Sequence, residues 1–211
     1  MPEWNLAPGQ IEAASMAIID QEAGEHGWPP GQWPVVRRMI HTSADFDYLE
    51  TVRMHPRAVD SGLAALRAGC RLLTDTRMAF AGISRRRLDP LGVRVACLMD
   101  HPEVARRARQ GGTTRAVAAV DLAVEHDPPA VFVIGNAPTA LLRLIEHIDS
   151  GRVAPALVVG LPVGFVNAAE SKQALAALDV PFITALGRKG GSNVAASVIN
   201  ALAIMCAEDL S

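Results

Sequence analysis

Short apolar runs alternate with amphipathic stretches over most of the chain. The runs are rich in β-branched residues and read CRLLTDT (70–76), VRVACLMD (93–100), AVFVIGN (130–136), ALVVGLP (156–162) and VPFITAL (180–186). The stretches between them have helical spacing and cover 103–110, 114–126, 139–149 and 168–178. Strands that are apolar on both faces and alternate with helices indicate a mostly parallel sheet with helices on both faces. We therefore predict a single α/β domain over residues 1–211.

The segments that flank this alternation are mainly helical. Apolar residues at helical spacing predict a helix over about 7–25 and a long apolar helix over 192–207. The prolines of WPPGQWP (28–34) predict a loop without regular structure. A strand over 48–54 and a helix over 56–69 are expected to follow.

Polar or glycine-rich segments come directly after several of the predicted strands. They are residues 75–77, 135–139, 160–164 and 187–192. Ligands of open parallel sheets bind beyond the carboxyl ends of the strands. We therefore expect these loops to converge on one pocket.

The composition narrows the class of protein. The chain is 50% hydrophobic and only 4% aromatic, so aliphatic side chains must form its core. A net charge of −2 disfavours a nucleic-acid partner. No apolar run reaches the roughly 18 residues of a membrane span, and the N-terminus lacks a secretory signal, so we expect a cytoplasmic protein. Cys70, Cys97 and Cys206 have no zinc-ligand spacing, and we expect neither a metal nor a cofactor.

The segment MIHTSADFDY (39–48) concentrates the candidate chemistry. His41 is followed by two hydroxyl residues, Thr42 and Ser43, and then by the carboxylates Asp45 and Asp47. An imidazole titrates between about pH 5 and 8, so the cluster suits proton transfer or a protonated ring held against a ligand. The same residue types cap helices and close turns, so spacing alone leaves both interpretations open.

Two further segments suit anions. GRKGGSN (187–193) places Arg188 and Lys189 before a glycine pair and a helix start, which favours a phosphate or carboxylate. The alternative is a plain turn capped by Ser192. Arg115 stands in the first turn of a predicted helix, where the helix dipole disfavours a cation, and is a modest candidate for ligand contact.

Several motifs, taken in order along the chain, resemble those of the precorrin-8X methylmutase family of corrin-ring (cobalamin) biosynthesis. They are MIHTSADFDY, LLTDTRMAFAGI, VIGNAPTAL, LPVGFVNAAESK and GRKGGSNVAAS. The resemblance covers residues 11 to about 203. It implies an isomerase that moves a methyl group from carbon 11 to carbon 12 of precorrin-8X, giving hydrogenobyrinate, or that acts on the cobalt-containing ring. It also implies a homodimer whose sites are shared by both subunits.

The resemblance further implies roles for individual residues. His41 falls on the family's proposed catalytic histidine, here a proton donor to a ring nitrogen, with Thr42, Ser43 or Asp45 orienting the imidazole. Ser15 falls on a serine that faces the substrate, although a helical serine can also bond a carbonyl one turn earlier. The expected substrate-binding residues, several of which would hold the substrate's carboxylates, are Ser15, Thr42, Ser43, Arg77, Arg115, Arg188, Lys189, Gly190 and Gly191.

Two other functions fit parts of the pattern. The same glycine loops and arginines would serve a tetrapyrrole-binding carrier that lacks catalysis. A nucleotide-dependent α/β enzyme rests on fold analogy alone, because both the GxxxxGK[ST] and the GxGxxG fingerprints are absent. No residue decides whether the natural substrate contains cobalt.

Overall fold

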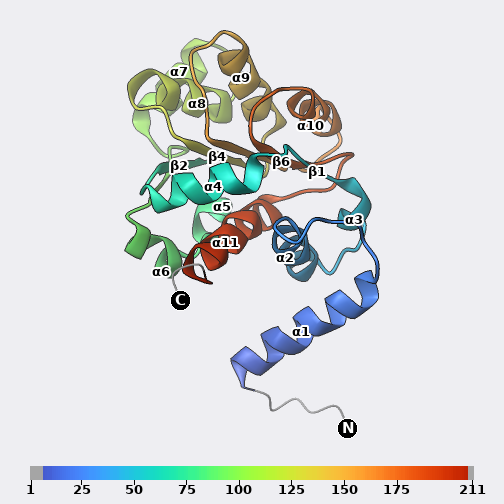
Figure 1. The fold of residues 1–211 in the computed structure, drawn as a ribbon. Coiled ribbons are helices and arrows are strands. Elements are labelled where there is room, and N and C mark those ends of the chain that lie inside the picture. The colour runs from blue at the N-terminus through green and yellow to red at the C-terminus, as the bar shows by residue number, and fades with distance from the viewer. Residues whose placement is uncertain (1–6, 209–211) are drawn as a thin grey trace.

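A sheet of six strands lies at the centre of the protein, as seen in a computed structural model that describes residues 7–208 (Figure 1). The strands are β1 (Val52–Met54), β2 (Arg71–Thr74), β3 (Arg94–Cys97), β4 (Val131–Ile134), β5 (Leu157–Gly160) and β6 (Phe182–Ala185). They lie in the order β1-β6-β5-β4-β2-β3, and every neighbouring pair is parallel except β1 with β6. The predicted α/β class and mostly parallel sheet are confirmed.

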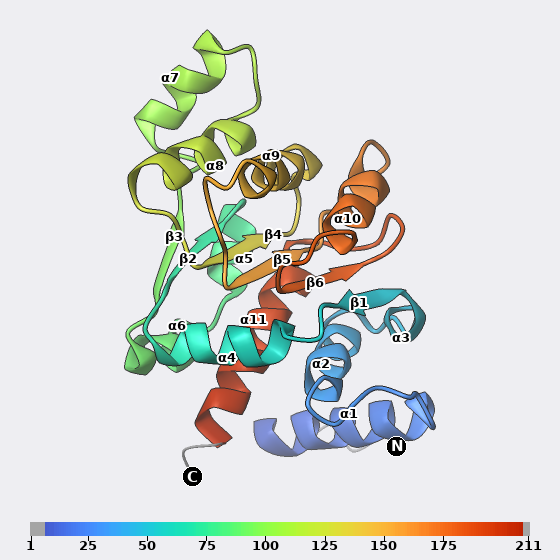
Figure 2. The ribbon, with the colours of Figure 1, turned by 45° about the horizontal axis from the view of Figure 1, so that its top comes forward.

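Helices cover both faces of the sheet (Figures 1 and 2). On one face lie α7 (Pro102–Gln110), α8 (Arg115–His126), α9 (Pro138–Asp149) and α10 (Ala168–Ala176). On the other lie α4 (Ala58–Arg67), α5 (Arg77–Gly82) and α11 (Ser192–Glu208), with α2 (Trp33–Ser43) packed against α11. The strands supply both cores, because successive side chains point to opposite faces. In β4, Val131 and Val133 join the core on the α11 face, whereas Phe132 and Ile134 join the core on the α9 face.

The structure departs most from the sequence prediction in the segment before β2. Helix α2 begins at Trp33, inside the predicted loop, because Pro34 stands in the first turn, where no N–H partner is needed. Most of the MIHTSADFDY segment therefore lies on α2 or in the turn that ends it. The expected strand over 48–54 is wrong at its start, since α3 (Tyr48–Thr51) precedes the short β1. The short helices α5 and α6 (Arg85–Leu88) are not predicted either.

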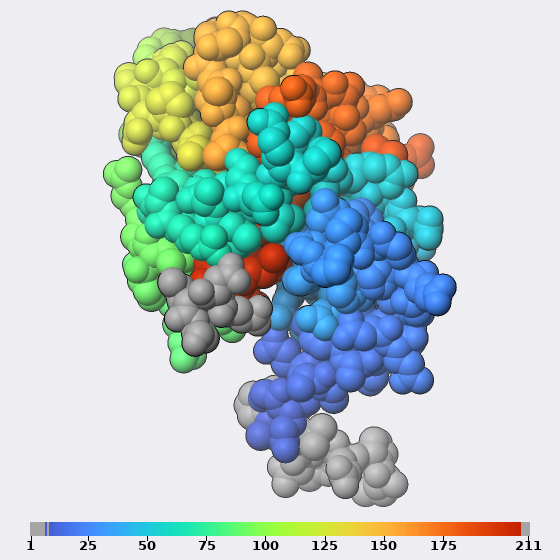
Figure 3. Space-filling view, in the orientation of Figure 1, coloured from blue at the N-terminus to red at the C-terminus, as the bar shows by residue number. Residues whose placement is uncertain are grey.

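Helix α1 (Pro8–Ala23) projects from the body of the molecule (Figure 3). It packs mainly against α2 and buries Ile19, which is 7% exposed. Two other apolar residues of the predicted helix stay outside: Ile11 is 48% exposed and Ile18 is 54% exposed. The helix itself is confirmed, but only part of its apolar side meets the rest of this chain. No helix within residues 7–208 is long and apolar enough to span a membrane.

Gly135, directly after β4, allows the sheet to approach the start of α11. A Cβ built on Gly135 would lie 2.6 Å from the Cα of Ser192, which is backbone and cannot turn aside. We expect Gly135→Ala to lower the free energy of unfolding by about 1–3 kcal/mol, measured by chemical denaturation. Gly31→Ala is the control, because nothing lies within 4 Å of a Cβ at that position. Equal stability of the two variants would contradict this packing.

Candidate active site

His41 lies in the last turn of α2 and lines a pocket of about 410 Å³. Ser15 of α1 lines the same pocket, so the structure brings together two of the residues singled out in the sequence. The remaining lining residues are Ile18, Ile19, Glu22, Ile40, Ala44 and Phe46. The Ser15 hydroxyl donates to the Ile11 carbonyl at 2.8 Å, the local bond that a helical serine commonly makes. The pocket therefore combines a half-buried imidazole with a mainly aliphatic wall.

The residues after His41 do not orient its ring. The Ser43 hydroxyl donates to the Met39 carbonyl at 2.8 Å, and Asp45 accepts from the Asp47 N–H and from Lys189. Within residues 7–208, no hydrogen bond joins His41 to Thr42, Ser43 or Asp45. The expectation that one of these three orients the imidazole is wrong in this structure. Both ring nitrogens remain available to a molecule in the pocket.

Lys189 clamps the turn that follows His41. Its ammonium donates to Asp45 and to Asp47, at 2.6 Å in each case. The bond from Lys189 lowers the pKa of Asp45, and the two carboxylates together raise the pKa of Lys189. Phe46, between the two carboxylates, faces the His41 pocket. The glycine-rich segment before α11 is thereby held against the end of α2.

Lys172 contacts the backbone of the same glycine-rich segment. Its side chain is fully buried, and its ammonium donates to the Lys189 carbonyl at 2.5 Å. Burial lowers its pKa to about 8. Lysine is very rarely buried without a partner, so this bond to the backbone is a specific contact. The only two lysines of the chain thus meet in one place.

The glycines after Lys189 fit closely against the loop that follows β5. A Cβ on Gly190 would collide with the carbonyl oxygens of Leu161 and Pro162. Gly191 has φ +133°, a conformation that L side chains rarely adopt, and its N–H donates to the Leu161 carbonyl at 2.9 Å. Both glycines are therefore required for packing, and their contact with a substrate stays a prediction.

Asp75 occupies the point between β2 and β4 where the strand order reverses. Its buried carboxylate accepts the backbone N–H groups of Gly135, Asn136 and Ala137 at 3.0, 2.8 and 2.8 Å. Burial raises the pKa of Asp75, and the three amide bonds oppose that rise. The Thr76 hydroxyl then meets that of Ser192, 2.8 Å away. Ser192 thus links the start of α11 to the residue that precedes α5.

The predicted basic residues differ in whether they already have a partner within the protein. The Arg77 guanidinium pairs with Asp100 at 2.5 Å, and that of Arg188 lies 5.4 Å from the ring centroid of Phe165. Arg115 is exposed at the start of α8 and has no carboxylate partner in the described part of the chain. Neither Arg77 nor Arg115 lines the His41 pocket. Their contact with a substrate stays a prediction.

Two residues of this region carry no role in the sequence prediction. Lys172 is one, and Phe165, with 84% of its surface exposed beside Arg188, is the other. Both belong to LPVGFVNAAESK, and lysine is rare in this arginine-rich chain, which was a signal for Lys172. Across residues 7–208, no group of three or more His, Cys, Asp or Glu side chains is arranged to hold a metal ion.

Comparison with known proteins places this architecture in a family. A sequence model described as CbiC, precorrin-8X methylmutase, matches residues 10–205. The cobalt-precorrin-8 methylmutase of Salmonella typhimurium is 46% identical over 201 residues, covering 92% of this chain and 94% of the relative. The precorrin-8X methylmutase structure from Thermus thermophilus is 48% identical, with a TM-score of 0.89 over 95% of this chain and 97% of that chain. The chain belongs to the precorrin-8X methylmutase family.

Membership of this methylmutase family makes the chain an isomerase of corrin biosynthesis, and the resemblance drawn from the sequence motifs is confirmed. A relative from Pseudomonas aeruginosa, 44% identical over 195 residues, is named precorrin-8X methylmutase. It covers 92% of this chain and 93% of its own length. Relatives of similar identity thus carry either precorrin-8X or cobalt-precorrin-8 in their names.

The buried Lys172 gives this methylmutase a pH-dependent stability. Because its pKa is lowered to about 8, the folded chain releases a proton that the unfolded chain keeps up to about pH 10.4. The unfolding free energy of the wild type should therefore rise between pH 8 and 10.4, relative to Lys172→Met, by up to about 3 kcal/mol. Denaturant titrations across this range test the difference. Lys189→Met should keep the rise, and parallel curves for the wild type and Lys172→Met would contradict it.

Proposed function

We propose that this protein isomerises precorrin-8X or its cobalt-containing counterpart by moving the methyl group on ring carbon 11 to carbon 12. The observation that carries the proposal is the His41 imidazole, which has no side-chain hydrogen bond within residues 7–208 and shares a pocket with Ser15. The reaction breaks one carbon–carbon bond and forms another within the same molecule. It needs no electron donor and leaves the mass unchanged.

His41 acts in this proposal as the proton donor. A protonated ring hydrogen-bonded to a macrocycle nitrogen holds the reactive tautomer and stabilises the charge that shifts as the methyl group migrates. The aliphatic wall of the pocket, which includes Ile18 and Ile19, suits the apolar face of a macrocycle. Lys189 holds the turn after His41 in place through its ion pairs with Asp45 and Asp47.

The substrate's acetate and propionate groups require cations. We propose Arg115 and Arg188 for this role, because neither has a carboxylate partner in the described part of the chain. Arg77 and Lys189 would have to exchange Asp100 and the Asp45–Asp47 pair for a substrate carboxylate. We therefore expect Arg115 and Arg188 to contribute more to binding.

We further propose a homodimer in which each site takes residues from both subunits. Two observations support it. Arg115 does not line the His41 pocket of its own chain, and α1 leaves Ile11 and Ile18 exposed next to that pocket. A second copy that covers α1 would bury these side chains and bring its own basic residues to the pocket.

Two alternative functions predict different outcomes. A tetrapyrrole carrier would bind substrate and product without converting an excess of substrate. A nucleotide-dependent enzyme would need free backbone N–H groups after β4 for a phosphate, but the Asp75 carboxylate already accepts three of them. We favour the isomerase over both.

Removal of the imidazole tests the catalytic role. We expect His41→Ala to lower turnover of precorrin-8X at least 100-fold, the low end of the usual effect of a general acid or base, and to leave product binding within a few-fold. Absorbance over time, with substrate in large excess and its mass confirmed as unchanged, measures turnover. His126→Ala removes an exposed histidine and is the control. Wild-type turnover by His41→Ala would refute the role, and parallel assays on the cobalt-loaded ring decide the substrate.

Mixing two inactive variants tests the shared sites. If a site takes His41 from one subunit and Arg115 from the other, His41→Ala mixed with Arg115→Ala should form heterodimers with one intact site. Turnover should recover to about a quarter of the wild-type rate, if both single variants are inactive and subunits exchange freely. Sedimentation measures the mass of the assembly. A monomer, or no recovery after proven exchange, would contradict the proposal.

A further inference from the structure

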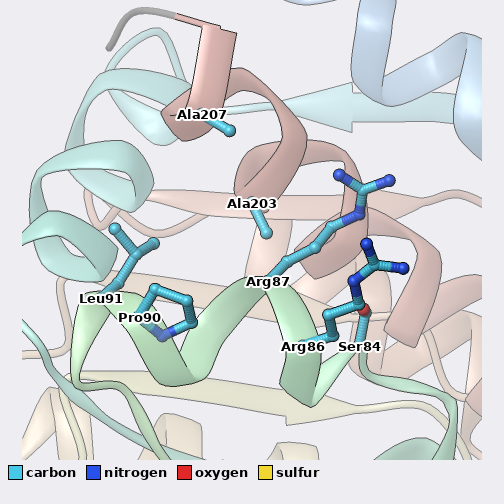
Figure 4. A pocket seen from close by; sticks show the side chains of 7 residues that line it. All are labelled: Ser84, Arg86, Arg87, Pro90, Leu91, Ala203 and Ala207. Atoms are coloured by element: carbon cyan, nitrogen blue, oxygen red, sulfur yellow. The ribbon is translucent and has the colours of Figure 1, made fainter.

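A hollow of about 440 Å³ lies outside the site described above, between α6 and the last turns of α11 (Figure 4). Arg86, Arg87 and Ser84 supply its polar groups, and the two guanidinium groups extend to the same side. Its apolar lining comes from Pro90, Leu91, Ala203 and Ala207. The hollow therefore combines two cations and a hydroxyl with an aliphatic wall.

Within residues 7–208, the two arginines have no ion-pair partner. In the described part of the chain, neither Arg86 nor Arg87 has a carboxylate within ion-pair distance, whereas their neighbour Arg85 pairs with Asp89 at 3.0 Å. Guanidinium groups bind carboxylates through parallel N–H donors, so two unpaired ones beside each other form a receptor for a carboxylate. Each is exposed, which limits the strength of the contact.

The hollow is a neighbour of the His41 pocket. The Glu12 carboxylate on α1 pairs with Arg38 on α2 at 2.7 Å. Glu12 stands one helical turn before Ser15, and Arg38 one turn before His41, so this ion pair borders the pocket. Arg38 also lines a small cleft with Ala201 and Met205 of α11, the helix whose Ala203 and Ala207 line the hollow, so α11 connects the two places.

We propose that Arg86 and Arg87 form a subsite for a peripheral carboxylate of the same tetrapyrrole whose ring lies against His41. The inference rests on the proposed function, and it adds a carboxylate contact outside the residues that line the His41 pocket. A large ring with acidic arms in several directions requires cations in several directions. In this proposal Arg188 binds one carboxylate of the substrate, and the arginine pair binds another.

The test separates binding from chemistry. We expect Arg86→Ala or Arg87→Ala to raise KM and the Kd of hydrogenobyrinate about 3-fold, and the double variant about 10-fold, with kcat within 2-fold. Arg109→Ala removes an exposed arginine of α7 and controls for the change in net charge. A product analogue with amidated side chains should bind the double variant and the wild type equally, because its arms carry no charge.

Each outcome decides one question. If wild-type protein converts substrate but the double variant keeps its KM and Kd, or matches Arg109→Ala, the subsite is wrong and the proposed function stands. A change in sedimentation mass of the double variant would assign the pair to contact between copies, which also overturns the subsite. If wild-type protein fails to convert either ring, the proposed function fails.

Discussion

The buried Asp75 carboxylate is the contact on which the arrangement of the loops depends. It stands where the strand order reverses, between β2 and β4, and its two oxygens accept three consecutive backbone N–H groups at the start of α9. A carboxylate in this position costs several kcal/mol of desolvation unless such donors compensate it. Doubly wound sheets usually bind an external ligand at this point, but here the carboxylate that directly follows β2 takes that place.

This internal anion occupies the backbone N–H donors that a ligand at the switch point would use. The proposed substrate site lies instead toward the sheet edge that carries β6 and β1, where the segment of Lys189 meets the end of α2. Gly190, packed on the loop after β5, and Lys172, below Lys189, hold that segment in place. The His41 pocket is built against this support.

Sequence patterns predict the elements that depend on nearby residues, such as buried strands. Both β4 and β5 are short, rich in β-branched residues and apolar on both faces, and these properties together indicate buried parallel strands. Helix α2 escapes prediction because Trp33 and Pro34 look like part of a proline loop, while the packing of α2 against α11 stabilises the helix. The ion pairs next to His41 escape prediction for another reason. Lys189 and Asp45 are 144 residues apart, so no local pattern shows that the lysine is already paired.

The same separation affects how the protein folds as it is synthesised. Helix α2 and strand β1 are made early, yet their main partners, α11 and β6, follow near the other end of the sequence. Contacts that close long loops form slowly, and a chain leaves the ribosome from its N-terminus. The apolar side of α2 therefore stays without α11 to pack against until most of the protein has been translated. A chaperone that shields this side during translation would protect the nascent chain from aggregation.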